Sequence, residues 1–396
     1  MGVEAGMEEA LAGQRGGRLS IVDQNGETVR VIAERPAKDG ATVQLTIDIE
    51  VQKKVEAALG TRPGSIVLMD PRDNSVLAMA TWPRFNPNGF ILGFPDEQWK
   101  QLSTDPRHPF QNRAAESAYP SGSIFKPFTT AAGMERAGLR GNNQYNCGGS
   151  WVVPGSNVVM GDWVKTGHGR LDLTEGLAES CDIVFYEVGM SLYRADPNAL
   201  TQMAQAFGLG QPTGINGIAD AAGTLPGPDW KKKNYNDAWY PGDAANFAIG
   251  QGFFEATPLQ MANAYTTLVR GGVHQTPLLV KRLIRPNQDP QEFQAKELNK
   301  VPLKPETIAT IREAMRRVTQ TPRGTAFYAF NGYRIPVGGK TGSAENQGPQ
   351  AHAWFAGFGP FDNPQVVVIA MVEGGEMGGV VAAPLGRKAF EITLGQ

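Results

Sequence analysis

The stretch Ser121-Gly122-Ser123-Ile124-Phe125-Lys126 decides both the fold and the chemistry expected of this chain. Ser123 and Lys126 are three positions apart, so on a helix both side chains lie on one face and the lysine amine can reach the serine hydroxyl. A serine with a base within reach is typical of a nucleophile that forms a covalent acyl intermediate. We therefore predict that Ser123 is acylated and that Lys126 activates it.

Two more short motifs follow in chain order, Ser180-Cys181-Asp182 and Lys340-Thr341-Gly342. An ordinary lysine is protonated at neutral pH, so Lys126 can act as a base only if burial lowers its pKa or if it shares a proton with neighbours. We expect Ser180 and Lys340 to be those neighbours. Asp182 adds a negative charge that raises the lysine pKa against the effect of burial, and the sequence leaves open which effect is larger.

The third motif is expected on an edge strand beside the nucleophile. The Lys340 ammonium and the Thr341 hydroxyl suit a substrate carboxylate, and Gly342 allows a substrate backbone to lie close to the strand. The same three letters occur at Lys165-Thr166-Gly167. That stretch precedes the middle motif and no strand pattern leads into it, so we assign the third motif to residues 340–342.

Composition narrows the class of protein. The chain has 396 residues, of which 41% are hydrophobic and 19% charged, and this is ordinary globular material. Its net charge of −2 excludes the basic surface expected of a nucleic-acid-binding protein. The longest apolar run, Val366 to Val372, is far shorter than the roughly 20 residues that cross a bilayer, so we expect the chain as given to be soluble.

Strand and helix patterns predict one sheet built from both ends of the chain. Residues 65–70 and 75–79 read as a hairpin, and Asp48 reads as the N-cap of a helix just before it. Three further strands are expected at residues 334–342, 353–358 and 365–372, and a closing helix at residues 384–394. This order predicts an α/β or α+β domain. We place its start near residue 46 and interpret residues 1–45, which have too few apolar residues for a core, as a fragment of another domain with a linker.

Around the three motifs the chain resembles the class B penicillin-binding proteins, in which Ser-x-x-Lys, Ser-x-Asn and Lys-Thr-Gly motifs are known signatures. The resemblance covers nearly all of residues 46–396. Further stretches that carry it are Trp82-Pro83, Asn112-Arg113, Tyr119-Pro120, Ile249-Gly250-Gln251-Gly252 and Ala256-Thr257-Pro258-Leu259-Gln260-Met261. An aspartate at position 182 and Trp239-Tyr240-Pro241-Gly242-Asp243 are similar to the elongation-type members related to penicillin-binding protein 2.

The resemblance implies a fold, an activity and partners. It implies a five-stranded antiparallel sheet flanked by helices, with residues 1–45 as the remnant of an N-terminal pedestal domain and residues 46–396 as the transpeptidase domain. The implied activity is cross-linking of peptidoglycan stem peptides that end in D-Ala-D-Ala, through an acyl-serine that β-lactams also form. Also implied are a membrane anchor, absent from this chain, a membrane glycosyltransferase partner, and a location at the outer face of the bacterial cytoplasmic membrane.

The resemblance also assigns roles to residues. Ser180 relays a proton to the leaving amine, and Asp182 holds the lysines and the substrate amide. The N–H groups of Ser123 and Ser343 form the oxyanion hole, which the start of a helix at Ser123 favours. No cofactor is expected for catalysis.

Two other functions share the first motif. A serine β-lactamase must activate water, but no Glu-x-x-Leu-Asn follows Asp182 to supply the deacylation base of class A enzymes. A β-lactam sensor or binding module would keep Ser123 and Lys126 and be acylated once, so the sequence separates it poorly from a transpeptidase. Turnover of a peptide or thioester substrate distinguishes the two.

A second group of candidate functional residues precedes the middle motif and ends within it. The chain has two cysteines, Cys147 and Cys181, and Asp162 and His168 lie between them in the sequence. All four are competent zinc ligands, and four protein ligands form a closed, structural site. The alternatives are a Cys147–Cys181 disulfide and buried free cysteines. The sequence leaves all three open.

Overall fold

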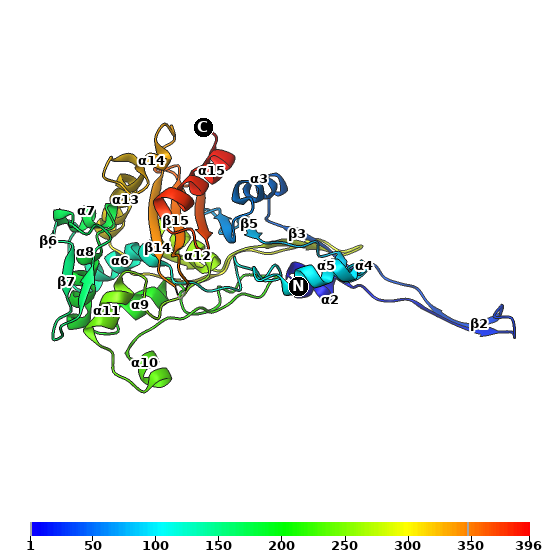
Figure 1. The fold of residues 1–396 in the computed structure, drawn as a ribbon. Coiled ribbons are helices and arrows are strands. Elements are labelled where there is room, and N and C mark those ends of the chain that lie inside the picture. The colour runs from blue at the N-terminus through cyan, green and yellow to red at the C-terminus, as the bar shows by residue number, and fades with distance from the viewer. Residues whose placement is uncertain (1, 347) are drawn as a thin grey trace.

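A five-stranded antiparallel sheet runs through the centre of the computed structural model, which describes residues 2–346 and 348–396 (Figure 1). Its strand order is β14-β15-β16-β4-β5, and the strands are β4 (Gly64–Met69), β5 (Val76–Trp82), β14 (Gly338–Ala344), β15 (His352–Gly359) and β16 (Val366–Val372). The predicted fold class is confirmed, as are the hairpin and the three C-terminal strands. β14 begins later than the predicted residue 334 because Pro336 has no N–H to donate to a neighbouring strand.

Both faces of the sheet are buried, and β16 shows this along its length. Val367, Ile369 and Met371 point into one hydrophobic core, whereas the alternating positions from Val366 to Val372 point into a second core. Side chains of a strand alternate between faces, so a continuous apolar run fits a strand that is covered on both sides.

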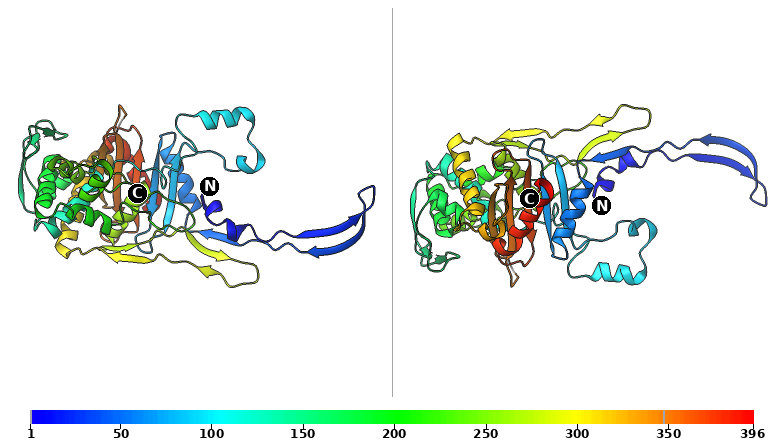
Figure 2. Two further views of the ribbon diagram at one scale, coloured as in Figure 1. Left: turned by 90° about the horizontal axis from the view of Figure 1, so that it is seen from below. Right: turned by 90° about the horizontal axis from the view of Figure 1, so that it is seen from above.

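Helices cover each face as separate layers (Figure 2). The smaller core lies under α3 (Ile49–Leu59), α14 (Phe327–Phe330) and α15 (Ala383–Leu394). The predicted cap of α3 is confirmed, because the Asp48 carboxylate accepts the N–H groups of Glu50 and Val51. The larger core lies on the opposite face, and its helices are α6 (Lys126–Arg136), α7 (Leu173–Ala178), α8 (Asp182–Ala195), α9 (Ala199–Ala206), α11 (Pro241–Ala248), α12 (Pro258–Val269) and α13 (Pro305–Gln320).

Small sheets surround this body. They are formed by β6 (Gln144–Cys147) with β9 (Gly169–Asp172), β7 (Ser150–Val152) with β8 (Val159–Gly161), β10 (Val273–Gln275) with β13 (Glu297–Lys300), and β3 (Thr42–Leu45) with β11 (Val280–Ile284) and β12 (Gln291–Glu292). The peripheral helices are α1 (Gly2–Gly6), α2 (Glu8–Leu11), α4 (Gly89–Leu92), α5 (Asp96–Thr104) and α10 (Pro228–Tyr235).

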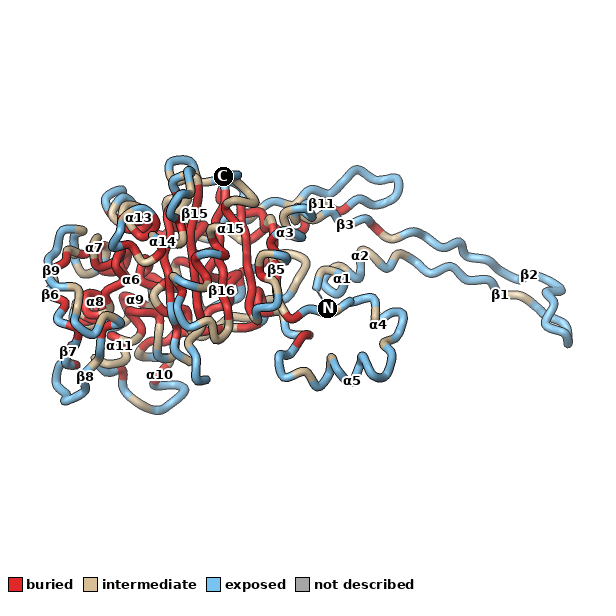
Figure 3. The backbone as a smooth tube through the Cα atoms, turned by 45° about the horizontal axis from the view of Figure 1, so that its top comes forward, coloured by how far each residue is buried: buried red, intermediate tan, exposed pale blue. Residues whose placement is uncertain are grey.

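The N-terminal ribbon of β1 (Gly17–Val22) and β2 (Thr28–Arg35) extends away from the body and is almost wholly exposed (Figure 3). It contributes no residue to either core. The division of the chain into two domains near residue 46 stays a prediction. Within residues 2–346 and 348–396, no helix combines the length and the apolar composition needed to cross a membrane.

Candidate active site

Ser123 lies in a turn that is fixed from several sides. The turn is a short 3-10 helix, η1 (Gly122–Phe125), which leads directly into α6. Three hydrogen bonds hold it, from the Gly122 N–H to the Gly250 carbonyl at 2.9 Å, from the Tyr265 hydroxyl to the Ile124 carbonyl at 2.6 Å, and from the Trp354 indole to the Pro120 carbonyl at 3.0 Å. In a 3-10 helix residues three apart are eclipsed, so Ser123 and Lys126 still share one side.

Strand β14 packs directly against this turn, and two glycines make the approach feasible. Gly122 has a positive φ of 55°, and a Cβ atom there would lie 2.6 Å from the Ser343 carbonyl oxygen. A Cβ at Gly342 would lie 3.0 Å from the Ser121 carbonyl oxygen. Glycine is therefore needed at position 342 for the packing of β14 against the turn. This reason adds to the close approach of the substrate that we predicted.

The middle motif lies between the two lysines. The buried Lys126 Nζ donates to the Ser180 carbonyl at 2.8 Å, to Ser180 Oγ at 3.3 Å and to Asp182 Oδ1 at 2.7 Å. The Lys340 Nζ donates to Ser180 Oγ at 2.8 Å and to the Thr341 carbonyl at 2.9 Å. A single hydroxyl thus connects two lysine side chains, each wholly removed from solvent.

The electrostatics of Lys340 differ from those of an ordinary lysine. Burial lowers the pKa of Lys340 well below its usual value, and the neighbouring charge of Lys126 lowers it further. The Asp182 carboxylate raises this pKa, but by less. For Lys340 burial is therefore a larger effect on the pKa than the opposing charge of Asp182, and it favours the neutral amine.

The backbone of Ser180 is in an unusual conformation. Its φ is +61°, in the left-handed region that residues other than glycine rarely adopt. It follows the end of α7, where the Cys181 N–H reaches back to the Gly176 carbonyl at 3.0 Å, and α8 begins at Asp182. This is the geometry of a helix C-terminus that normally has glycine at the left-handed position. A serine there costs conformational energy and turns the hydroxyl toward the lysines.

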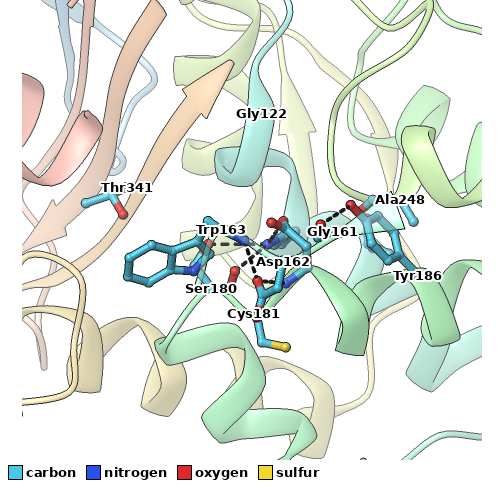
Figure 4. A network of polar contacts seen from close by, with 12 residues as sticks. Gly122, Gly161, Asp162, Trp163, Ser180, Cys181, Tyr186, Ala248 and Thr341 are labelled. Atoms are coloured by element: carbon cyan, nitrogen blue, oxygen red, sulfur yellow. Dashed lines mark hydrogen bonds and ion pairs between the residues drawn. The ribbon is translucent and has the colours of Figure 1, made fainter. Parts of the chain in front are cut away.

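The two Lys-Thr-Gly stretches lie in different places. Lys340 contacts Ser180, whereas the Lys165 Nζ donates to the Asp162 carbonyl at 3.2 Å, in a loop that wraps around Cys147. Figure 4 shows Thr341 at the left of Ser180, with the turn that begins at Gly122 above them. Residue Ser343 also lies at this turn, and its hydroxyl accepts the Gly378 N–H at 3.2 Å.

The four predicted metal ligands converge on one point. Asp162 Oδ2 lies 2.8 Å from Cys147 Sγ and 2.6 Å from His168 Nδ1, and the two sulfurs are 2.7 Å apart. All four donor atoms lie within 4.8 Å of one another, and both cysteines are free. The sulfur of Cys181 points away from Thr341 and from the turn at Gly122 (Figure 4).

This donor set fits a divalent metal ion such as zinc. Burial raises the pKa of both thiols, so Cys147 and Cys181 need a cation nearby to become thiolates. Burial opposes ionisation of Asp162, but hydrogen bonds from His168, Cys147 and the Asp182 N–H lower its pKa to about 2. Two sulfurs, one ring nitrogen and one carboxylate oxygen are a combination that Zn²⁺ accepts in closed sites.

The cluster is joined to the middle motif through the backbone. Asp162 Oδ1 accepts the Asp182 N–H at 3.1 Å and the Trp163 N–H at 2.8 Å. Cys181 lies between Ser180 and Asp182 in the chain, so a group that fixes its sulfur also limits the movement of both neighbours.

Two charge pairs near the site were not predicted. Arg113, whose side chain is 2% exposed, donates to Glu373 at 2.8 Å, and the Tyr119 hydroxyl donates to the same carboxylate at 2.7 Å. This pair fastens the segment before the nucleophile to the end of β16. Arg323 contacts Glu179 at 2.7 Å, next to Ser180. The partners are 260 and 144 positions apart, so no local pattern could have paired them.

The structure brings the three motifs together in one site, and the third lies on the edge strand β14 of a sheet that is covered on both faces. This arrangement defines an active-site serine protein of the Ser-x-x-Lys class. A family model described as "Penicillin binding protein transpeptidase domain" matches residues 64–391. The chain therefore belongs to the penicillin-binding protein transpeptidase family, as its sequence predicted.

Individual relatives agree with this assignment. The chain is 34% identical over 415 residues to the peptidoglycan D,D-transpeptidase MrdA of Haemophilus influenzae, covering 100% of this chain and 63% of the relative. The structure of PBP2 from Helicobacter pylori in complex with MreC matches with a TM-score of 0.83 and 27% identity, covering 98% of this chain and 71% of that chain. The penicillin G acyl-enzyme complex of penicillin-binding protein A from M. tuberculosis matches with a TM-score of 0.77 and 27% identity, covering 90% and 81%. The predicted similarity to penicillin-binding protein 2 is confirmed, and the chain spans less than two thirds of the length of its MrdA relative.

Proposed function

We propose that this chain contains the catalytic domain of a peptidoglycan D,D-transpeptidase of the elongation type. The observation that carries the proposal is Ser180 Oγ, which is hydrogen-bonded to Lys126 and Lys340 beside the turn of Ser123. This arrangement supplies a nucleophile, a base and a proton relay within one buried site. Residues 46–396 form the transpeptidase domain, and residues 1–45 are the remnant of an N-terminal pedestal domain with a linker.

The first half of the reaction forms the acyl-enzyme. Ser123 Oγ attacks the carbonyl carbon between two D-alanine residues while its proton passes to the free amine of Lys126. Burial favours the neutral form of Lys340, and Ser180 Oγ, which is hydrogen-bonded to both lysines, offers a route for proton exchange between Lys340 and Lys126. The negative charge that develops on the carbonyl oxygen is stabilised by the N–H groups of Ser123 and Ser343.

The leaving group departs when the carbon–nitrogen bond breaks. Ser180 Oγ gives its proton to the nitrogen of the terminal D-alanine and recovers one from Lys126, so the proton of Ser123 ends on the departing amine. An amine of a second stem peptide then attacks the ester carbonyl, loses its proton by the reverse route, and releases Ser123. A β-lactam enters by the same first step, but its leaving nitrogen stays attached.

Substrate binding uses the free edge of β14. An extended peptide can add to this edge by backbone hydrogen bonds, since β14 is the last strand of the sheet. Thr341 and Lys340 attract the terminal carboxylate, and Gly342 and Ser343 lie along the bound peptide. Asp182 keeps the two lysines in place through its contact with Lys126 at 2.7 Å.

A structural zinc ion binds the four-residue cluster and has no part in the chemical steps. Its ligands are Cys147, Asp162, His168 and Cys181. When bound, the ion would stabilise the two thiolates that burial otherwise disfavours. The residues around it then hold the loop of Ser180 and Asp182. Catalysis itself needs no cofactor.

The longer protein is expected to have partners and a location of the family type. It acts on stem peptides at the outer face of the bacterial cytoplasmic membrane and works with a membrane glycosyltransferase. The H. pylori neighbour was solved with MreC, which supports a protein related to MreC as a further partner. β-Lactam antibiotics acylate it.

Intact-mass measurement with benzylpenicillin tests the proposal. The chain should gain the mass of one penicillin and hold it, and Ser123→Ala should gain none. Turnover of a D-Ala-D-Ala peptide or a thioester analogue should accompany this, because a sensor would be acylated without turnover. Rapid loss of the adduct with hydrolysed antibiotic would instead indicate a β-lactamase.

A further inference from the structure

Thr341 has a partner in a separate part of the chain. Its Oγ1 lies 2.6 Å from Thr325 Oγ1, on the loop between α13 and α14. Thr341 is 6% exposed and belongs to the edge strand, whereas Thr325 is half-buried. The two hydroxyls face each other directly, and in the structure that of Thr341 donates to Thr325.

The loop holds Thr325 rigidly. The Gly324 N–H donates to the Thr321 carbonyl at 2.8 Å, and the Ala326 N–H donates to the Val318 carbonyl at 3.0 Å. A Cβ atom at Gly324 would lie 2.2 Å from the Arg317 carbonyl oxygen, so the loop is packed against the last turns of α13. These contacts fix the backbone on both sides of Thr325.

A hydroxyl has one proton and two acceptor sites. When the Thr341 hydroxyl donates to an anionic carboxylate, it can no longer donate to Thr325. The Thr325 hydroxyl can then rotate and donate to Thr341 Oγ1, so that Thr341 keeps its second hydrogen bond while its proton points at the anion. Chains of hydrogen bonds of this kind strengthen one another.

We propose that Thr325 is a positioning residue for the substrate carboxylate, which acts by orienting the hydroxyl of Thr341. This inference rests on the proposed function and deepens it. It assigns to the α13–α14 loop a part in selecting donors and β-lactams that carry a free carboxylate. Thr325 itself touches no reacting atom.

The test compares acylation of the full chain by benzylpenicillin and by its methyl ester, in which the carboxylate is masked. Thr325→Val removes the hydroxyl but keeps the shape, and should lower the second-order acylation rate constant for benzylpenicillin by about 2- to 10-fold, the effect of one hydrogen bond between neutral groups. The ester should react equally with both proteins. Thr325→Ser, which keeps the hydroxyl, should restore the rate with benzylpenicillin.

The outcomes separate the possible failures. An equal fall for benzylpenicillin and ester, or no fall for benzylpenicillin, would overturn the positioning role, because a purely structural defect affects both substrates. If Thr325→Val does not fold, Thr325→Ala applies the same comparison. Absence of any acylation of the unmodified chain would refute the proposed function first, and the inference with it.

Discussion

Replacing Gly122 with alanine should separate the close packing of β14 against the nucleophile turn from simple backbone strain. Gly122 has a φ of +55°, and a Cβ atom there would lie 2.6 Å from the Ser343 carbonyl oxygen. Gly138, just after α6, has a φ of +67° and no atom within 4 Å of such a Cβ. The same substitution at the two positions therefore adds similar strain but meets a neighbour at only one of them.

The magnitudes follow from these two surroundings. A left-handed alanine costs about 1–2 kcal/mol, which is the whole effect expected for Gly138→Ala. At Gly122 the new methyl group must push β14 away, which adds about 1–3 kcal/mol of overpacking. We therefore expect Gly122→Ala to lower the free energy of unfolding by about 2–5 kcal/mol. The shift of Ser343 relative to Ser123 should slow acylation by about 10- to 100-fold, because reacting groups are sensitive to displacements below 1 Å.

Urea unfolding and stopped-flow acylation by a fluorescent penicillin measure the two quantities. Gly138→Ala should acylate at the rate of the unmodified chain. The reasoning fails if Gly122→Ala matches Gly138→Ala in both stability and rate, since β14 would then tolerate the methyl group. It also fails if Gly122→Ala is unstable but reacts at the normal rate, since the distance between Ser343 and the turn would not matter.

Three further predictions concern charges and the metal cluster. Asp182→Asn removes a charge that raises the pKa of Lys340, so this pKa should fall further. The pH at which acylation reaches half its plateau should then move to lower pH, and an unchanged or more alkaline profile would contradict the assigned role. Cys147→Ser should lose bound zinc, measured by elemental analysis after dialysis, and acylation should slow while Ser123 remains reactive; a metal content equal to that of the parent would exclude the site. Glu373→Gln leaves the buried Arg113 without a charged partner and should cost about 2–3 kcal/mol in urea unfolding, toward the lower end for buried pairs because the Glu373 side chain is 25% exposed; a cost below about 0.5 kcal/mol, as for a surface pair, would show that the pair is solvated.

The regular parts of the fold could be predicted because their signals are local. Short runs rich in apolar residues marked the five strands, and Asp48 marked the start of α3 because a cap needs only its own next three residues. The family motifs then indicated which residues to bring together, and the structure places Lys126, Ser180 and Lys340 in contact.

Other features depend on contacts that the sequence does not display. The left-handed conformation of Ser180 follows from how α7 ends against α8, and a serine gives no sign of it. Thr325 and Thr341 are 16 positions apart on different elements, so their contact requires the turn between them to be known. The balance of effects on Lys340 also had to await the structure, because burial and neighbouring charges act over distances that only the fold sets.

The sheet has a consequence for how the protein is made. β4 pairs with β16, and these strands are about 300 residues apart in the chain. During translation, the β4–β5 hairpin leaves the ribosome long before its partner and exposes apolar side chains on both sides until β16 arrives. The active site is therefore completed at the same stage at which the hairpin becomes protected from aggregation, near the end of synthesis. Any interruption before β16 would leave a chain that is both inactive and prone to associate with itself.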